Sequence, residues 1–164
     1  GPHYTMDSYI KKFLEENNIE YELYTHRAVF SCEESKIYCK HVPGISGKNL
    51  FLKDEKGKQF FLVVLPCKKK LDLNTLAFFL KVKKLKFANE QELKNILELS
   101  PGSVSILGLL NDKERKTELI IERSMWEAEK LNFHPNINTE SLTFHQENFH
   151  KLVQILCKEY RIFE

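Results

Sequence analysis

Three polar or glycine-bearing segments stand beside apolar stretches of the sequence, and they hold its main candidates for chemistry. They are Gly47-Lys48-Asn49, Pro101-Gly102-Ser103 with the stretch that continues to Gly108, and residues 134–139, which read HPNINT. Backbone N–H groups near glycines can stabilise an oxyanion, and small residues allow a ligand to approach closely. Taken singly, each segment is more typical of a surface lysine, a turn or a structural histidine.

Lys48 stands at the mouth of an apolar stretch, next to Asn49. A lysine has an ordinary pKa of about 10.4, so a protonated Lys48 suits an anchor for an anionic group such as a phosphate. If desolvation lowered that pKa, the amine could act as a base instead. Both roles are compatible with the sequence.

Nucleophilic catalysis is the competing chemistry. Cys32, Cys67 and Ser103 are candidate nucleophiles, but the sequence has no G-x-S-x-G motif, and no histidine accompanies any of them in a catalytic motif. The cysteines, which also include Cys39 and Cys157, show no C-x-x-C spacing, and this disfavours a zinc site. We therefore expect reduced thiols, no metal and no cofactor.

The bulk composition is that of an ordinary globular protein, with 42% hydrophobic and 29% charged residues. No apolar run approaches the roughly 18 residues that cross a bilayer, and no secretory signal is visible. We therefore expect a cytoplasmic protein without a membrane partner. The first five residues, GPHYT, look like the remnant of an expression tag, and residues 6–164 suit a single domain.

The net charge of +2 is too small to imply nonspecific binding of polyanions, because 25 basic and 23 acidic side chains nearly cancel. Local clusters matter more than this sum. Lys68-Lys69-Lys70 is one basic run, and the lysines within residues 81–86 form a second. Either run could face a phosphate backbone, although a solvated surface is the simpler interpretation.

Periodicity and capping signals predict interleaved helices and strands. Gly57 lies in the EKGK turn of an expected hairpin, whose second strand reads as buried on both faces. Capping is expected from the Ser31-x-x-Glu34 and Asn89-x-x-Glu92 spacings and from Asp72 or Asn74. The expected helices are residues 9–17, a short one from 31, 75–82, 93–99, 124–131 (a helix or a helical turn) and 149–156, and the expected strands are 20–25, 49–54, 59–66, 103–107, 117–122 and 141–144.

Several of these strand pairs are joined by turns too short for parallel crossovers, so the sheet must be mixed or mostly antiparallel. This excludes a simple Rossmann domain. The phosphate-loop motif G-x-x-x-x-G-K-[ST] and the dinucleotide motif G-x-G-x-x-G are also absent from the sequence.

Six segments in order resemble the YbaK-type aminoacyl-tRNA deacylases, the bacterial prolyl-tRNA editing family. They are VFSCEES (29–35), GKNLFLKD (47–54), FFLVVLPCKKKLDLNTLA (60–77), KFANEQEL (86–93), LSPGSVSILGLLND (99–112) and FHPNINTESL (133–142). Each is short and degenerate, but six in register make a chance similarity improbable. The order KNLFL, PGSV and HPxxNT is similar to the branch that removes alanine from mischarged prolyl-tRNA.

The resemblance implies an α+β fold, in which a mixed, mostly antiparallel sheet curls partly around a small pocket and helices surround it. It also implies metal-free hydrolysis of the ester that joins an amino acid to the terminal adenosine of tRNA. Lys48 would then be the catalytic residue, Asn49 its neighbour at the substrate, and His134 a contact of the terminal adenosine. The other candidate substrate-binding residues are Phe30, Gly102, Ser103, Val104, Gly108, Asn138 and Thr139.

The expected partner is accordingly the acceptor end of mischarged tRNA(Pro), and prolyl-tRNA synthetase is a further candidate. A synthetase site large enough for proline cannot strongly exclude alanine, because missing methylenes change discrimination by only about 1–3 kcal/mol. Ala-tRNA(Pro) is therefore the leading substrate of a trans-acting or synthetase-appended enzyme. Cys-tRNA(Pro), which a related branch clears, is the alternative substrate.

One departure from the family pattern concerns the glycine segment. This branch usually reads PGSVTPF there, whereas Ser105, Ile106 and Leu107 occupy the last three places in this chain. The missing proline puts the shape of the loop and the amino-acid preference in question. It also motivates an alternative from a different class, a noncatalytic tRNA- or synthetase-binding module, against which the retained Lys48 and His134 argue.

Overall fold

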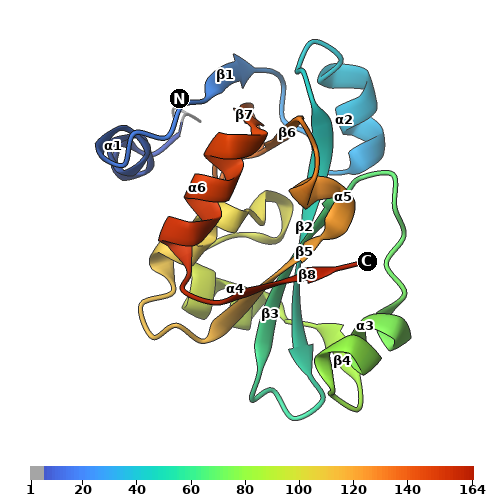
Figure 1. Cartoon of the computed structure of the whole chain (residues 1–164). Coiled ribbons are helices and arrows are strands. Elements are labelled where there is room, and N and C mark those ends of the chain that lie inside the picture. The colour runs from blue at the N-terminus through green and yellow to red at the C-terminus, as the bar shows by residue number, and fades with distance from the viewer. Residues whose placement is uncertain (1–5) are drawn as a thin grey trace.

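The structure is a computed structural model that describes residues 6–164, so the expected tag remnant at 1–5 lies outside the described residues. Figure 1 labels its helices and strands in chain order. The helices are α1 (Ser8–Glu16), α2 (Cys32–Tyr38), α3 (Leu73–Leu80), α4 (Glu90–Leu97), the 3-10 helices η1 (Pro101–Ser103) and η2 (Ile106–Asn111), α5 (Arg123–Trp126) and α6 (Gln146–Leu156). The strands are β1 (Glu22–Thr25), β2 (Ile45–Asp54), β3 (Phe60–Pro66), β4 (Leu85–Phe87), β5 (Thr117–Glu122), β6 (Lys130–Phe133), β7 (Glu140–His145) and β8 (Tyr160–Phe163).

Side-chain caps begin three of the helices at the expected places. Ser31 Oγ accepts a hydrogen bond from the Glu34 amide at 3.1 Å, and Asp72 accepts from the two amides at the start of α3. At α4 the capping box is complete, because Asn89 accepts from the Glu92 amide and the Glu92 carboxylate accepts from the Asn89 amide. These bonds satisfy amides that have no partner within the helix.

The strands form one mixed sheet in the order β1-β7-β6-β2-β3-β5-β8, with β4 paired to β2 outside this path. The pairs β1–β7, β6–β7, β2–β3 and β2–β4 are antiparallel, whereas β2–β6, β3–β5 and β5–β8 are parallel. This confirms the predicted α+β class and mixed sheet. Strand β2 joins the two parts of the sheet, because only Ile45 and Ser46 pair with β6 before the strand continues along β3.

Both faces of the sheet are covered by apolar packing. The larger core cluster includes residues of α1, α4, η2 and α6, and the smaller one includes Leu76, Ala77 and Leu80 of α3. Every residue of β3 is buried, as predicted for a strand covered on both faces. Figure 1 shows α6 in front of one part of the sheet and α3 beside β4 at the opposite end.

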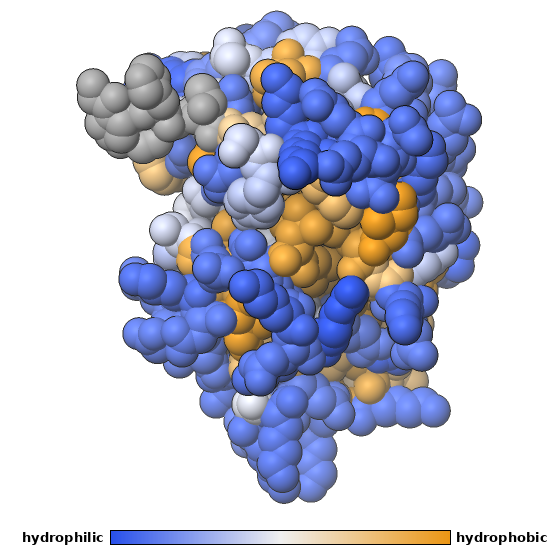
Figure 2. Space-filling model, turned by 90° about the vertical axis from the view of Figure 1, so that its left-hand side faces the viewer, coloured by the Kyte–Doolittle hydropathy of each residue, from blue (hydrophilic) through white to orange (hydrophobic). Residues whose placement is uncertain are grey.

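One face of the molecule also exposes hydrophobic residues. Figure 2, which views the left-hand side of Figure 1, shows hydrophobic residues in the middle of that face, with hydrophilic residues around them. No helix within residues 6–164 combines the length and the apolar character that crossing a membrane requires.

The structure corrects three predictions about secondary structure. Residues 103–107 are not a strand: the chain enters η2 there, with Ser105 Oγ accepting from the Leu107 amide at 3.1 Å. The helix or helical turn expected at 124–131 is a single turn, Arg123–Trp126, and the chain forms β6 from Lys130 instead of continuing the helix. The short strands β4, β6 and β8 were not predicted.

Candidate active site

A cavity of about 160 Å³ lies where the first residues of β2 meet the start of α2, the helix η1 and the end of β6. This volume is below the roughly 300–1,000 Å³ of sites for drug-sized ligands, so the cavity suits a small group. Its lining residues are Val29, Phe30, Ser31, Cys32, Ser35, Ser46, Gly47, Lys48, Asn49, Cys67, Pro101, Gly102, Val104, Asn132, Phe133 and His134.

Lys48 reaches this cavity from the β2–β3 pair, in which it lies opposite Leu65. It is half-buried, and it forms no ion pair within residues 6–164. Burial disfavours the charged form and lowers the pKa of Lys48 below its ordinary value. The Lys48 amine is therefore easier to deprotonate than the amine of a surface lysine.

Asn49 contributes an unsatisfied acceptor to the same cavity. Its side-chain oxygen is buried and has no hydrogen-bond partner among the described residues. Side chains alternate along a strand, so Asn49 and Gly47 lie on one face of β2 and Lys48 on the other. Gly47 is held close to α5, because a Cβ at this position would lie 2.7 Å from Met125 Cε.

Phe30 and Gly102 form one wall of the cavity. The Phe30 side chain is 71% exposed, and its Cδ1 would lie 3.3 Å from a Cβ built on Gly102. Asn138 is also near, since its Nδ2 would lie 3.9 Å from the same Cβ. The Val29 amide donates to the Asn138 carbonyl at 3.1 Å, which ties this wall to the HPNINT segment.

His134 presents a defined tautomer. Its Nδ1 lies 2.9 Å from the Glu140 carbonyl oxygen, which can only accept, so Nδ1 carries the proton. Burial is the main cause that lowers the pKa of His134, and the neighbouring His26, whose ring centroid is 5.6 Å away, adds to it. The ring is therefore neutral near pH 7, and Nε2 is its accepting nitrogen.

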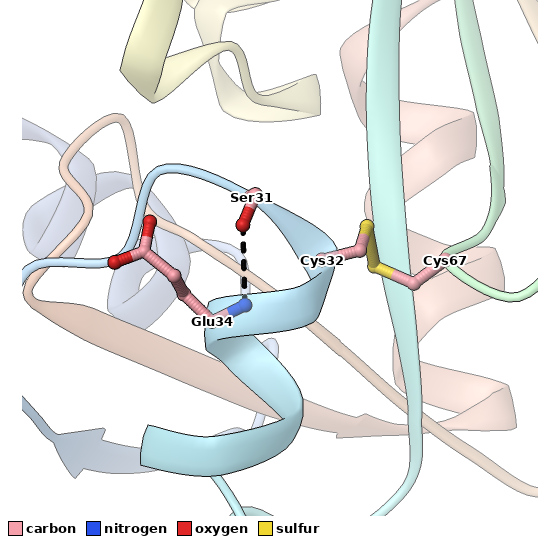
Figure 3. The surroundings of a disulfide bond; sticks show 4 residues. All are labelled: Ser31, Cys32, Glu34 and Cys67. Atoms are coloured by element: carbon pink, nitrogen blue, oxygen red, sulfur yellow. Dashed lines mark hydrogen bonds between the residues drawn. A yellow bond between two sulfur atoms is a disulfide. The ribbon is translucent and has the colours of Figure 1, made fainter.

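A disulfide borders the cavity, and it corrects the expectation of reduced thiols. Cys32, at the first turn of α2, is bonded to Cys67, directly after β3, with a Cα–Cα distance of 5.6 Å. Figure 3 shows this bond beside the Ser31 cap of α2. The Cys67 amide also donates to the Ser46 carbonyl at 2.9 Å, which fixes Cys67 beside β2, and the disulfide links residues separated by 35 positions in the sequence. Cys39 and Cys157 are free.

Six of the predicted site residues border the cavity, and four do not. Lys48, Asn49, Phe30, Gly102, Val104 and His134 line it, whereas Ser103, Gly108, Asn138 and Thr139 are absent from the lining. Gly108 instead packs in the core, where a Cβ would lie 2.6 Å from Leu99 Cδ1. The catalytic and binding roles of all ten residues stay predictions.

Sequence reasoning missed the polar residues that α2, β2 and β6 bring to the cavity. Ser35, Ser46 and Asn132 line it, and Asn132 is 4% exposed. Asn132 Nδ2 donates to the Pro43 carbonyl at 3.0 Å and thereby fixes the turn before β2. The available signal was a polar residue inside the apolar run LNF.

The fold and the cavity together define an α+β domain with a small, partly polar site at the junction of a mixed sheet. A family model of the aminoacyl-tRNA editing domain matches residues 26–152. The chain belongs to this family. It is thus an aminoacyl-tRNA deacylase, an enzyme that hydrolyses the ester between an amino acid and its tRNA.

Two curated relatives illustrate the similarity. The prolyl-tRNA editing protein ProX of Acetoanaerobium sticklandii is 36% identical over 152 residues, which cover 92% of this chain and 92% of the relative. The prolyl-tRNA synthetase associated domain-containing protein 1 of Danio rerio is 33% identical over 134 residues, which cover 82% of this chain and 72% of the relative.

Solved structures share the fold at low sequence identity. A crystal structure of a hypothetical protein superposes with a TM-score of 0.73 at 15% identity and covers 94% of this chain and 97% of its own. Another, described as a candidate trans-editing enzyme for prolyl tRNA synthetase, gives a TM-score of 0.69 at 13% identity and covers 92% of this chain and 94% of its own. These likenesses bear on the fold alone.

Proposed function

We propose that the enzyme hydrolyses the ester of mischarged tRNA(Pro), and that Ala-tRNA(Pro) is its substrate. The observation that carries the proposal is the convergence of Lys48, Asn49 and His134 on one small cavity. The relatives support the choice of tRNA, because one is a prolyl-tRNA editing protein and the other has a domain associated with prolyl-tRNA synthetase. Prolyl-tRNA synthetase is also our proposed partner.

The cavity offers complementary groups for an aminoacyl ester. The buried Asn49 oxygen can accept a hydrogen bond from the α-amino group of the aminoacyl moiety. His134 Nε2 can accept a proton from the attacking water or a hydrogen bond from the terminal ribose. The ester is activated, so the enzyme mainly has to position a water and stabilise the oxyanion. The Gly102 segment borders the cavity, where its backbone N–H groups could donate to that oxyanion.

Lys48 is the proposed catalytic residue. Lys48 lines the cavity and has no carboxylate partner in the described part of the chain, so its amine is available to the substrate. In its protonated form it would hold an anionic oxygen of the reacting end, and burial favours the neutral form that could accept a proton. Either role requires a nitrogen at this place in β2.

Size is the proposed source of selectivity. A cavity of about 160 Å³ has to hold the aminoacyl group together with a water, whose share of liquid volume is about 30 Å³. Steric exclusion can reject a larger side chain more strongly than a hydrophobic site can reject a smaller one. Alanine would enter, and the proline ring would overlap with the Phe30–Gly102 wall.

The altered segment Ser105-Ile106-Leu107 does not favour a noncatalytic module. All three residues are completely buried, and none borders the cavity. The substitutions therefore change the packing of η2 in the core and leave the residues around Lys48 in place. Cys-tRNA(Pro) remains the competing substrate, because cysteine differs from alanine by one sulfur.

A side-by-side deacylation assay tests the proposal with tRNA(Pro) charged with alanine, cysteine or proline. We expect the alanyl ester to be cleared fastest and the prolyl ester to stay at the uncatalysed rate. Lys48→Ala should lower kcat/KM by roughly 100-fold or more, on the scale of a lost proton-transfer group, while Lys83→Ala, at an exposed position, serves as the matched control. Substantial turnover by folded Lys48→Ala would place the chemistry elsewhere, and binding of tRNA without cleavage of any ester would favour the noncatalytic module.

A further inference from the structure

A second groove of about 450 Å³ lies directly beside the cavity, along α2 and the end of β3. We call it the lysine groove. It is lined by Cys32, Ser35, Lys36, Cys39, Lys40, Gly44, Ile45, Ser46, Pro66, Cys67, Lys68 and Lys69. None of its four lysines is among the expected site residues, and the proposed chemistry does not involve them.

The charge of the lysine groove has one sign. Its lining includes no aspartate and no glutamate. Lys69 is paired with the buried Glu122 at 2.6 Å, but Lys36, Lys40 and Lys68 are exposed and form no ion pair in the described part of the chain. Three unpaired ammonium groups around one hollow create a local positive potential that the small net charge conceals.

Other grooves of the molecule differ in charge. One, beside α1 and β1, includes Glu15, Glu20 and Glu22, and another, beside β5, mixes Arg115 and Lys116 with Glu118. The lysine groove is therefore distinguished from both by its uniform positive charge. It is also the one that adjoins the cavity, because Cys32, Ser35, Ser46 and Cys67 line both hollows.

We propose that the lysine groove binds the phosphate backbone of the single-stranded acceptor end while the terminal aminoacyl ester occupies the cavity. This inference rests on the proposed function, since the ester is covalently continuous with a polyanion that must leave the cavity across neighbouring surface. Lysines suit this task because an ammonium group contacts phosphate without reading the base. Ile45 and Pro66 add apolar surface for sugars and bases between the charges.

The proposal commits to RNA, although an acidic segment of a partner protein carries the same sign of charge. Adjacency decides between them: the four shared lining residues leave little surface between the reacting ester and the groove. A tRNA positioned in this way binds through contacts that are the same for every amino acid. The groove would therefore supply affinity, and the cavity would supply selection.

The test compares two triple variants of equal charge change on two substrates. Lys36→Gln/Lys40→Gln/Lys68→Gln removes the unpaired charge of the groove, and Lys81→Gln/Lys83→Gln/Lys84→Gln removes the second basic run, which is also exposed. The substrates are Ala-tRNA(Pro) and alanyl-adenosine, which has the ester but no internucleotide phosphate. Binding of uncharged tRNA(Pro), followed between 50 and 200 mM salt, is the second readout.

We expect the groove variant to lose kcat/KM on Ala-tRNA(Pro) and to retain the wild-type rate on alanyl-adenosine. Each phosphate contact with a single strand adds about 0.7 to the slope of log affinity against log salt, so three lysines contribute about 2. The wild-type advantage in tRNA binding should thus shrink about 20-fold between 50 and 200 mM salt. The control variant should behave like the wild type.

Three results would overturn the inference: equal losses in both triple variants, an unchanged salt slope in the groove variant, or a matching loss on alanyl-adenosine. Weaker binding of prolyl-tRNA synthetase with unchanged tRNA binding would assign the groove to an acidic protein and would also overturn it. Failure of the wild-type enzyme to cleave either substrate is a different result, because it contradicts the proposed function itself.

Discussion

Removal of the Cys32–Cys67 disulfide should destabilise the protein by an amount that the chain geometry predicts. The bond joins residues separated by 35 positions. In the chain-entropy model, a loop of this length lowers the entropy of the unfolded state by about 13 cal/mol/K, which corresponds to about 4 kcal/mol at 25 °C. Native domains have a free energy of unfolding of about 5–15 kcal/mol, so the loss is a large part of the total stability.

Urea denaturation of Cys32→Ser/Cys67→Ser measures this loss directly. Trp126 is the only tryptophan, and its ring stacks on His150 at a centroid distance of 3.6 Å, so its fluorescence should report unfolding. With a denaturant slope of about 2 kcal/mol/M, the urea midpoint should fall by about 2 M. Wild-type protein under a thiol reductant should shift to the same midpoint.

The double variant is its own control, because a reductant has no disulfide to open in it. The reasoning would be refuted if the variant unfolded within about 1 kcal/mol of the oxidised wild type, since loop closure would then contribute little. It would also be refuted if the reductant lowered the midpoint of the double variant as much as that of the wild type.

Three further perturbations test individual contacts. Gly44→Ala should destabilise by about 3 kcal/mol, because its φ is +97° and a Cβ would lie 2.9 Å from the backbone of Lys130 and Leu131; Gly57→Ala, with φ +69° but only an ordinary contact at 3.9 Å from Glu92 Oε2, should lose only about 1 kcal/mol by the same urea measurement. Folded His134 binds a proton less readily than unfolded His134, so its contribution to stability is present above about pH 6.5 and is lost as the pH falls below it; His134→Gln should flatten this part of the profile of unfolding free energy against pH, and an unchanged profile would contradict the lowering of the His134 pKa by burial. Glu92→Gln should cost about 1–2 kcal/mol in thermal or urea unfolding, since Glu92 accepts from both Lys53 Nζ at 2.6 Å and the Asn89 amide, whereas Glu90→Gln in the same first turn should be nearly neutral, and equal effects of the two would be evidence against the shared acceptor.

Local signals predicted the elements that carry their own boundaries. The strands around Gly57, the buried run Phe60–Pro66 and the capped helices α2, α3 and α4 all follow from turn chemistry, periodicity and caps. The strand predicted at residues 103–107 is wrong because a short apolar run fits a strand and a buried helical turn equally well. The strand Leu85–Phe87 was missed because a strand of three residues is defined by its pairing with β2 and hardly by its own sequence.

The candidate site was predictable where the motifs include it and unpredictable where the fold assembles it. Lys48, Asn49 and His134 lie in motifs and do meet at the cavity. Asn132 and Ser35 come from β6 and α2, and a parallel contact of only two residue pairs between β2 and β6 brings Asn132 there. The cysteine pairing depended on the same long-range geometry, because the spacing of four cysteines does not reveal which two meet.

The free cysteine Cys39 lines the lysine groove together with both cysteines of the disulfide. Burial raises the pKa of Cys39, and only a thiolate attacks a disulfide efficiently. Cys39 should therefore attack the Cys32–Cys67 disulfide only slowly. Correct pairing should accordingly persist during storage at neutral pH, and rearranged isomers should accumulate only when the chain opens or the solution becomes strongly alkaline.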